Sequence, residues 1–139
     1  MPDTVVRPRP RTVSAGVVAH DLRSAAVAQA ALAAQPGLEV VGSALNVGTL
    51  LHRTGPLKAV ALEVPPVDDV DVMLLATCLL ATGAAVVCFT LADTDVPQQA
   101  QLVAAGIALV GVAQLPRELL MSALLPLPQS PAWPGARLW

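Results

Sequence analysis

The chain has 139 residues, which is the length of one domain and enough for a substantial hydrophobic core. The formal net charge at pH 7 is -2 and there is one Phe and no Tyr, so composition argues against a nucleic-acid partner and against aromatic platforms that stack bases. Hydrophobic residues make up 55% and charged residues 13%, about half the usual charged fraction, which favours an oligomer or a tightly bound partner.

Short apolar strands alternate with helices five times along the chain. In chain order we expect a strand at 12–19, a helix at 22–34, a strand at 38–44, a helix at 47–53, a strand at 59–62, a helix at 68–82, a strand at 84–91, a helix ending at 105, a strand at 107–113 and a helix at 116–125. This alternation predicts an α/β domain whose parallel sheet is covered by helices on both faces.

The predicted domain spans 12–125 and is flanked by two tails. The arm at 1–11 is polar and interrupted by prolines, so we expect it to be disordered. The tail at 126–139 is rich in proline and contains Trp133 and Trp139; it is either a disordered tail or docks on a partner as an extended peptide. Within the domain, Asp21 and Asn46 are expected to cap the first two helices.

The strand at 59–62 is the centre of the predicted sheet. It is an unbroken apolar run that ends at Glu63 and is then stopped by two prolines. In open parallel sheets, ligands and chemistry gather just beyond the carboxyl ends of the strands. Glu63 is therefore the first candidate for a functional residue.

A membrane span must be weighed, because residues 72–92 contain no charge and are long enough to cross a bilayer. Gly83 interrupts this run, and no Lys, Arg or aromatic belt flanks it, so we expect a soluble, cytoplasmic protein with no membrane partner. Cys78 and Cys88 lack metal-ligand spacing and lie in apolar runs, so we expect two buried, reduced thiols.

Three segments together resemble the receiver domain of bacterial response regulators, and the resemblance extends over about 12–125. They are the first strand with its polar end at 17–22, the lead-in to the second strand at 36–42, and the fourth strand at 86–90 followed by Ala-Ala-Gly at 104–106. The resemblance implies a flavodoxin-like (βα)5 three-layer fold with strand order 2-1-3-4-5. It also implies signal transduction or transcriptional control as part of a two-component system.

The family uses an acidic pair that helps bind Mg²⁺, an Asp that accepts a phosphoryl group, a hydroxyl residue and a Lys. By resemblance these positions fall on His20 with Asp21, on Glu63, on Thr90 and on Ala113. Only Asp21 and Thr90 fit the pattern. Because Mg²⁺ prefers oxygen ligands and the phosphoryl group needs a cation, we expect no cofactor beyond weak Mg²⁺ binding, no metal site and no phosphotransfer. The domain is thus predicted to be a pseudo-receiver without enzymatic activity or catalytic residues.

Some details of this degenerate pocket stay open. Pro66 follows Glu63 by three positions where the family has about four, and the Lys position falls on Ala113 or Val112, so the register is open by one residue. Glu63 either mimics a phosphorylated Asp, pairs with His20 and closes the pocket, or is simply a carboxylate at the start of a loop. His20 is either a pH-sensitive partner of Glu63 or a passive polar residue.

The predicted function is regulation through protein–protein interaction, independent of phosphorylation, as a homodimer or with another regulatory protein. In the family, the fourth helix, fifth strand and fifth helix form the interaction face, and here that part of the sequence is unusually apolar. The expected interaction residues are Leu102, Val103, Leu119, Leu120 and Leu124. The alternative is a regulatory domain that binds a small molecule in the degenerate pocket.

Overall fold

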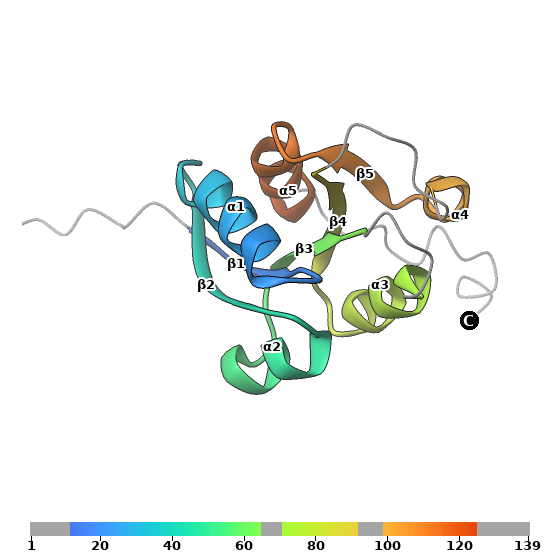
Figure 1. Ribbon diagram of the computed structural model, residues 1–139, viewed down its shortest axis with the longest axis horizontal. Helices are drawn as coiled ribbons and strands as arrows, with labels where there is room; N and C mark the ends of the chain where they lie inside the picture. The colour runs from blue at the N-terminus through green and yellow to red at the C-terminus, as the bar shows by residue number, and fades with distance from the viewer. Residues whose placement is uncertain (1–11, 65–70, 92–98, 125–139) are drawn as a thin grey trace, which may run out of the picture.

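The computed structural model describes residues 12–64, 71–91 and 99–124, and these form five strands alternating with five helices (Figure 1). The predicted arm at 1–11 and tail at 126–139 lie outside the described residues, as do both tryptophans. In chain order the elements are β1 (Val13–Val18), α1 (Leu22–Ala33), β2 (Leu38–Ala44), α2 (Val47–Thr54), β3 (Ala59–Glu63), α3 (Val72–Ala81), β4 (Ala85–Thr90), α4 (Gln99–Ala104), β5 (Ala108–Gly111) and α5 (Leu115–Leu124).

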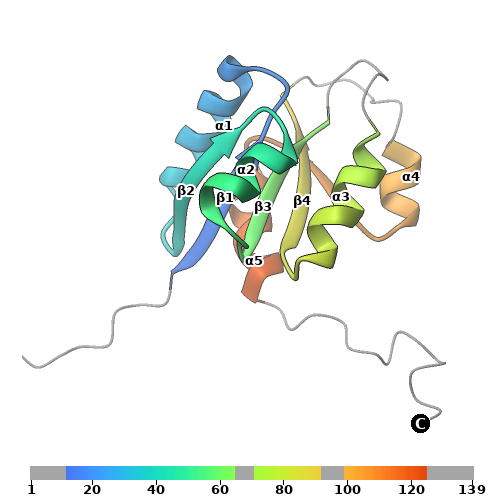
Figure 2. The same cartoon turned by 90° about the horizontal axis from the view of Figure 1, so that it is seen from below.

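All five strands lie in one parallel sheet with the order β2-β1-β3-β4-β5 (Figure 2). The strand β3 is central, and each of its five residues is buried, as the unbroken apolar run at 59–62 predicts. It pairs with β1 on one side, where Val18 aligns with Leu62, and with β4 on the other, where Glu63 aligns with Phe89. The predicted α/β class and strand order are confirmed.

Helices cover both faces of the sheet and bury two separate apolar clusters. Residues of α1 and α5, such as Ala28, Leu32 and Leu119, pack on one face. Residues of α2, α3 and α4, such as Leu50, Leu79 and Leu102, pack on the other. Figure 1 shows α1 and α5 on one side of the sheet and α2 and α3 on the opposite side. This is the three-layer arrangement of a doubly wound fold.

Short polar side chains begin the helices as their local chemistry predicts. Asp21 accepts a hydrogen bond from the backbone N–H of Ser24 at 2.7 Å, and Asn46 accepts one from Thr49 at 2.7 Å. Asp71 caps α3 by accepting from the N–H of Leu74 at 3.0 Å, so α3 begins later than the predicted residue 68. The last strand is also shorter than predicted, because β5 ends at Gly111 and a turn leads into α5.

The charge-free segment at 72–92 does not form one long helix. Helix α3 ends at Ala81, Gly83 turns the chain with a φ of 91°, and β4 follows as a strand inside the sheet. Across the ranges 12–64, 71–91 and 99–124, no helix is both long enough and apolar enough to cross a bilayer.

The two cysteines differ in environment. Both are free thiols, and Cys88 is fully buried in β4 as predicted. Cys78, however, is exposed on α3, so the prediction of a second buried thiol is wrong. The reason is that α3 carries apolar residues around its whole circumference, and its buried side is formed by Val72, Ala76 and Leu79.

Candidate functional site

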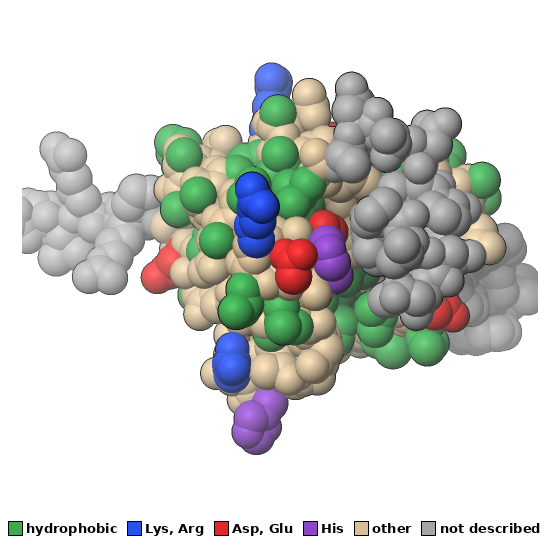
Figure 3. Space-filling model, in the orientation of Figure 1, with side chains coloured by type: hydrophobic (Ala, Val, Ile, Leu, Met, Phe, Trp, Pro, Cys, Tyr) green, Lys and Arg blue, Asp and Glu red, His purple; other side chains and the backbone are tan. Residues whose placement is uncertain are grey.

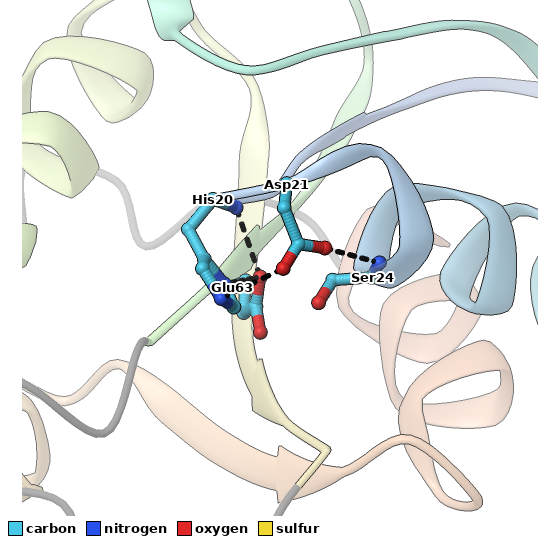
Figure 4. Close-up of polar contacts among 4 residues, drawn as sticks. All are labelled: His20, Asp21, Ser24 and Glu63. Atoms are coloured by element: carbon cyan, nitrogen blue, oxygen red, sulfur yellow. Dashed lines mark hydrogen bonds and ion pairs between the residues drawn. The ribbon is translucent and has the colours of Figure 1, made fainter.

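The site lies where the carboxyl ends of β1 and β3 meet. These strands are neighbours in the sheet, so the residues that follow β1 come close to the end of β3 although they are far apart in sequence. His20 and Asp21 follow β1 after one intervening residue, Ala19, and Glu63 is the last residue of β3. The structure therefore brings three of the predicted pocket residues into direct contact (Figure 4).

Glu63 is a buried carboxylate that His20, in the loop after the neighbouring strand β1, contacts through both its backbone and its ring. Its side chain is 3% exposed. The oxygen Oε1 accepts a hydrogen bond from the backbone N–H of His20 at 2.9 Å and lies 2.6 Å from Nδ1 of the same residue. Burial without a partner would be costly for a carboxylate, and these two contacts give Oε1 polar partners.

Asp21 holds the other side of the imidazole. Its Oδ2 lies 3.1 Å from Nε2 of His20, while its Oδ1 accepts the capping hydrogen bond from Ser24. The hydrogen bond from the backbone of Ser24 lowers the pKa of Asp21 below its ordinary value of 3.8, and the charge of nearby His20 lowers it further. Both oxygens of Asp21 are thus already engaged.

The His20 ring consequently lies between two carboxylates, with each nitrogen facing one of them (Figure 4). The three residues differ in exposure: the His20 and Asp21 side chains are 42% and 51% exposed, whereas Glu63 lies beneath them. Figure 3 shows acidic side chains next to a histidine side chain at the surface of the face seen in Figure 1. We call His20, Asp21 and Glu63 the carboxylate–imidazole cluster.

The carboxylate–imidazole cluster does not fit a magnesium ion. Mg²⁺ needs free oxygen ligands in a nearly octahedral array. Here Oε1 of Glu63 and both oxygens of Asp21 already face protein donors, and the imidazole fills the space between the carboxylates. Within the described part of the chain, no group of three or more His, Cys, Asp or Glu residues is arranged to hold a metal ion.

The two remaining pocket residues lie at the same edge of the sheet. Thr90 ends β4 and is half-buried, one position beyond the residue that aligns with Glu63. Ala113 lies exposed in the turn between β5 and α5. Neither Val112 nor Ala113 carries a positive charge, and the next basic residue, Arg117, lies exposed on α5. The sequence does not single out Ser24, whose backbone N–H donates to Asp21. The separation of three positions between these residues is, however, the usual spacing of a helix N-cap.

The predicted interaction face requires a correction. Leu102 and Leu119 are fully buried, one in each apolar cluster, so they belong to the core and cannot contact a partner. Leu120 is partly buried against the cluster beneath α1 and α5. Val103 and Leu124 are each 62% exposed and remain available at the surface. Adjacent leucines on a helix point in different directions, which is why sequence proximity does not place them on one face.

Comparisons with known proteins show the fold. No family model matches the sequence, and no curated protein matches it. Among solved structures, the chain resembles the response regulator domain of Thermotoga maritima CheB, with a TM-score of 0.58, 15% identity, and coverage of 81% of this chain and 94% of that one. It likewise resembles the signal receiver domain of the putative response regulator NarL from Mycobacterium tuberculosis, with a TM-score of 0.58, 15% identity, and coverage of 83% and 95%.

A third similar structure is a DNA-binding response regulator of the LuxR family from Staphylococcus aureus, with a TM-score of 0.58, 12% identity, and coverage of 80% of this chain and 98% of that one. Identities this low carry information about architecture and not about chemistry. The strand order, the alternation of strands and helices and these three likenesses lead to one conclusion. The chain has the fold of a response-regulator receiver domain.

Proposed function

We propose that this chain is an atypical receiver-like domain that acts in cytoplasmic signal transduction through protein–protein contacts, without being phosphorylated. The carboxylate–imidazole cluster is the observation that supports the proposal. The carboxylate at the expected acceptor position is buried, and its Oε1 is already bound by the backbone and the ring of His20. An oxygen held in this way is poorly placed to attack a phosphoryl donor.

Two further residues support the same proposal. A phosphoryl group adds negative charge that needs a nearby cation, and Ala113 supplies none at the position where the family has Lys. A divalent ion would also have to displace His20 from between Asp21 and Glu63. We therefore infer at most weak Mg²⁺ binding and a regulatory role that involves no enzymatic step.

Incubation with acetyl phosphate and Mg²⁺, read by intact mass, tests the proposal. We expect the mass to be unchanged after hours of incubation. A gain of one phosphoryl group that disappears in a Glu63→Gln variant would refute phosphorylation independence. Weak Mg²⁺ binding is tested separately by the change in melting temperature with MgCl₂, because a ligand that binds only the native state raises that temperature.

The interaction proposed for this domain is self-association or contact with another regulatory protein. The exposed apolar residues Val103 on α4, and Met121 and Leu124 on α5, are 62%, 51% and 62% exposed. Large apolar side chains at the surface of a chain with few charges favour association. We do not extend the proposal to a small-molecule ligand, since His20 already engages the buried carboxylate of the pocket.

A further inference from the structure

We infer that His20 is held as an imidazolium, so that a proton on this ring takes the place of a bound cation and ties the loop after β1 to the end of β3 in a pH-dependent way. This pH dependence affects the same pocket as the proposed function, and its consequence for signalling rests on that function. The charge state itself depends only on the geometry.

The two contacts of the His20 ring indicate that both of its nitrogens are protonated. A neutral imidazole has one N–H donor and one bare nitrogen that accepts, whereas an imidazolium donates from both nitrogens. In this structure Nδ1 lies 2.6 Å from Oε1 of Glu63 and Nε2 lies 3.1 Å from Oδ2 of Asp21. With both carboxylates ionised, a neutral ring would place the lone pair of its unprotonated nitrogen next to a carboxylate oxygen, and the two would repel each other. Only the imidazolium satisfies both contacts at once.

The balance of charges in the cluster also favours a protonated His20. Two carboxylates and one imidazolium leave a net charge of one negative unit, part of which the backbone N–H of His20 offsets at Glu63. Within the described part of the chain, the ring of His20 is the group in contact with the 3% exposed side chain of Glu63 that can supply a positive charge. Nearby opposite charges favour the charged form of a histidine and raise its pKa.

Among the described residues, the two carboxylates in contact with the ring come from different parts of the chain. Asp21 belongs to the same loop and Glu63 to β3. The other charged residues within six positions of these in the sequence are Arg23 on α1 and Lys58 before β3, which are exposed, and Asp68 and Asp69, which lie outside the described residues. A double variant of Asp68 and Asp69 to Asn is therefore included among the controls.

The sign of the pH dependence follows from this arrangement. The unfolded chain releases the His20 proton near the ordinary histidine pKa of about 6.5. If the folded value is higher, the contribution of His20 to stability is fully present below about 6.5 and is lost as the pH rises through the folded value. Above it, the contact between the ring and one carboxylate turns unfavourable, so the loop that carries His20 and Asp21 keeps its backbone hydrogen bond to Glu63 but loses the ionic part of its attachment to β3.

Nuclear magnetic resonance of the whole chain tests the inference directly, because there are two histidines to assign. We expect the His20 ring to carry protons on both nitrogens at pH 7 and therefore to titrate with a midpoint above that pH, higher than the ordinary histidine value of about 6.5. His52 lies exposed on α2, away from the cluster, so His52→Asn assigns the signals and serves as the matched control. A ring with one protonated nitrogen at pH 7, or a midpoint at or below about 6.5, would overturn the inference.

Two conservative variants separate the inference from a purely structural role. Glu63→Gln and Asp21→Asn each remove one charge and keep an oxygen that accepts hydrogen bonds, and both should lower the His20 midpoint. The larger fall is expected for Glu63→Gln, because its carboxylate is buried and closer to the ring. Midpoints that move in neither variant, or that move as far in the Asp68→Asn/Asp69→Asn control, would refute the assignment of the proton to this cluster.

The two proposals can fail independently. The phosphorylation test is read by mass and the proton test by the ring nitrogens. A chain that accepts a phosphoryl group but holds an imidazolium would refute phosphorylation independence alone. A chain that stays unphosphorylated with a neutral ring would refute this inference alone.

Discussion

The backbone N–H and the ring Nδ1 of His20 converge on one oxygen, Oε1 of Glu63, at 2.9 and 2.6 Å. The two residues are 43 positions apart, so the contact exists only because β1 and β3 are adjacent in the sheet. It joins the loop that begins α1 to the central strand. The same contact removes the carboxylate from solvent and gives it a specific partner.

Truncating Glu63 should destabilise the fold. Glu63→Ala leaves the N–H of His20 without its acceptor, and losing the partner of a hydrogen-bonded group costs about 1–3 kcal/mol. Glu63→Gln keeps an acceptor oxygen and should cost less. Urea unfolding at pH 6 measures both, with Glu39→Gln on the exposed side of β2 as the control. Equal stability of Glu63→Ala and the parent chain would show that the contact contributes nothing.

The N-cap of α1 should make stability depend on acidic pH. The pKa of Asp21 is lowered, chiefly by the Ser24 backbone hydrogen bond, so its contribution is present above the unfolded pKa of about 3.9 and is lost as the pH falls through the lower folded value. Asp21→Ala should be less stable than Asp21→Asn, because Asn still caps a helix. Circular dichroism melts between pH 2 and 7 would reveal the difference. No dependence on the residue at position 21 would contradict the role of the cap.

The two thiols should react at very different rates. Burial raises the pKa of the Cys88 thiol to about 12 from an ordinary value of 9.0, which leaves roughly a thousandfold less of the reactive thiolate at neutral pH. Cys78 is exposed. A thiol-reactive dye should label one site per native chain and two per unfolded chain. Cys78→Ser should abolish the fast reaction, and Cys88→Ala should leave it unchanged.

Surface charges should test the proposed association. Val103→Glu and Leu124→Glu place charges on the exposed parts of α4 and α5, and both should weaken self-association by at least about tenfold in Kd if that surface forms the contact. Leu74→Glu, on exposed α3, is the matched control. Analytical ultracentrifugation at micromolar concentration measures the effect. A parent chain that sediments as a monomer would contradict self-association.

Restoring the family's residues in the pocket should allow the chain to be phosphorylated. The triple variant His20→Asp, Glu63→Asp and Ala113→Lys supplies the second carboxylate of the family's acidic pair, a shorter acceptor and a cation for the phosphoryl group. We expect it to gain mass with acetyl phosphate while the parent chain does not. The same variant without Ala113→Lys should gain less. Phosphorylation of the parent chain to the same extent would remove the basis for the proposal.

Much of the fold could be predicted from local sequence. The bounds of β2 match the predicted residues 38–44, and Asp21 and Asn46 cap the helices that they were predicted to cap. Such features depend on residues that are close together in the sequence. The unbroken apolar run of β3 likewise predicts a strand that is buried on both faces. Strand order came from the resemblance, because periodicity alone does not say which strands are neighbours.

The site was predictable only in part. Pairing of His20 with Glu63 was one of three readings, and choosing it required the adjacency of β1 and β3. The exposure of Cys78 and the burial of Leu102 were not foreseen, because α3 and α4 carry no charged residue among those described to mark their outer sides. A helix without charged residues gives little indication of its rotation about its own axis.

The difference between the two cysteines has a practical consequence. Because Cys78 is exposed and Cys88 is buried, one spin label or fluorophore can be attached to the Cys78 thiol of each native molecule without mutagenesis. Leu74 lies one helical turn before it on the same exposed side, so a probe at Cys78 would report any molecule that comes to rest on α3. Energy transfer between labelled copies would then locate the contact surface, whether it lies on α3 or on the far side of β5.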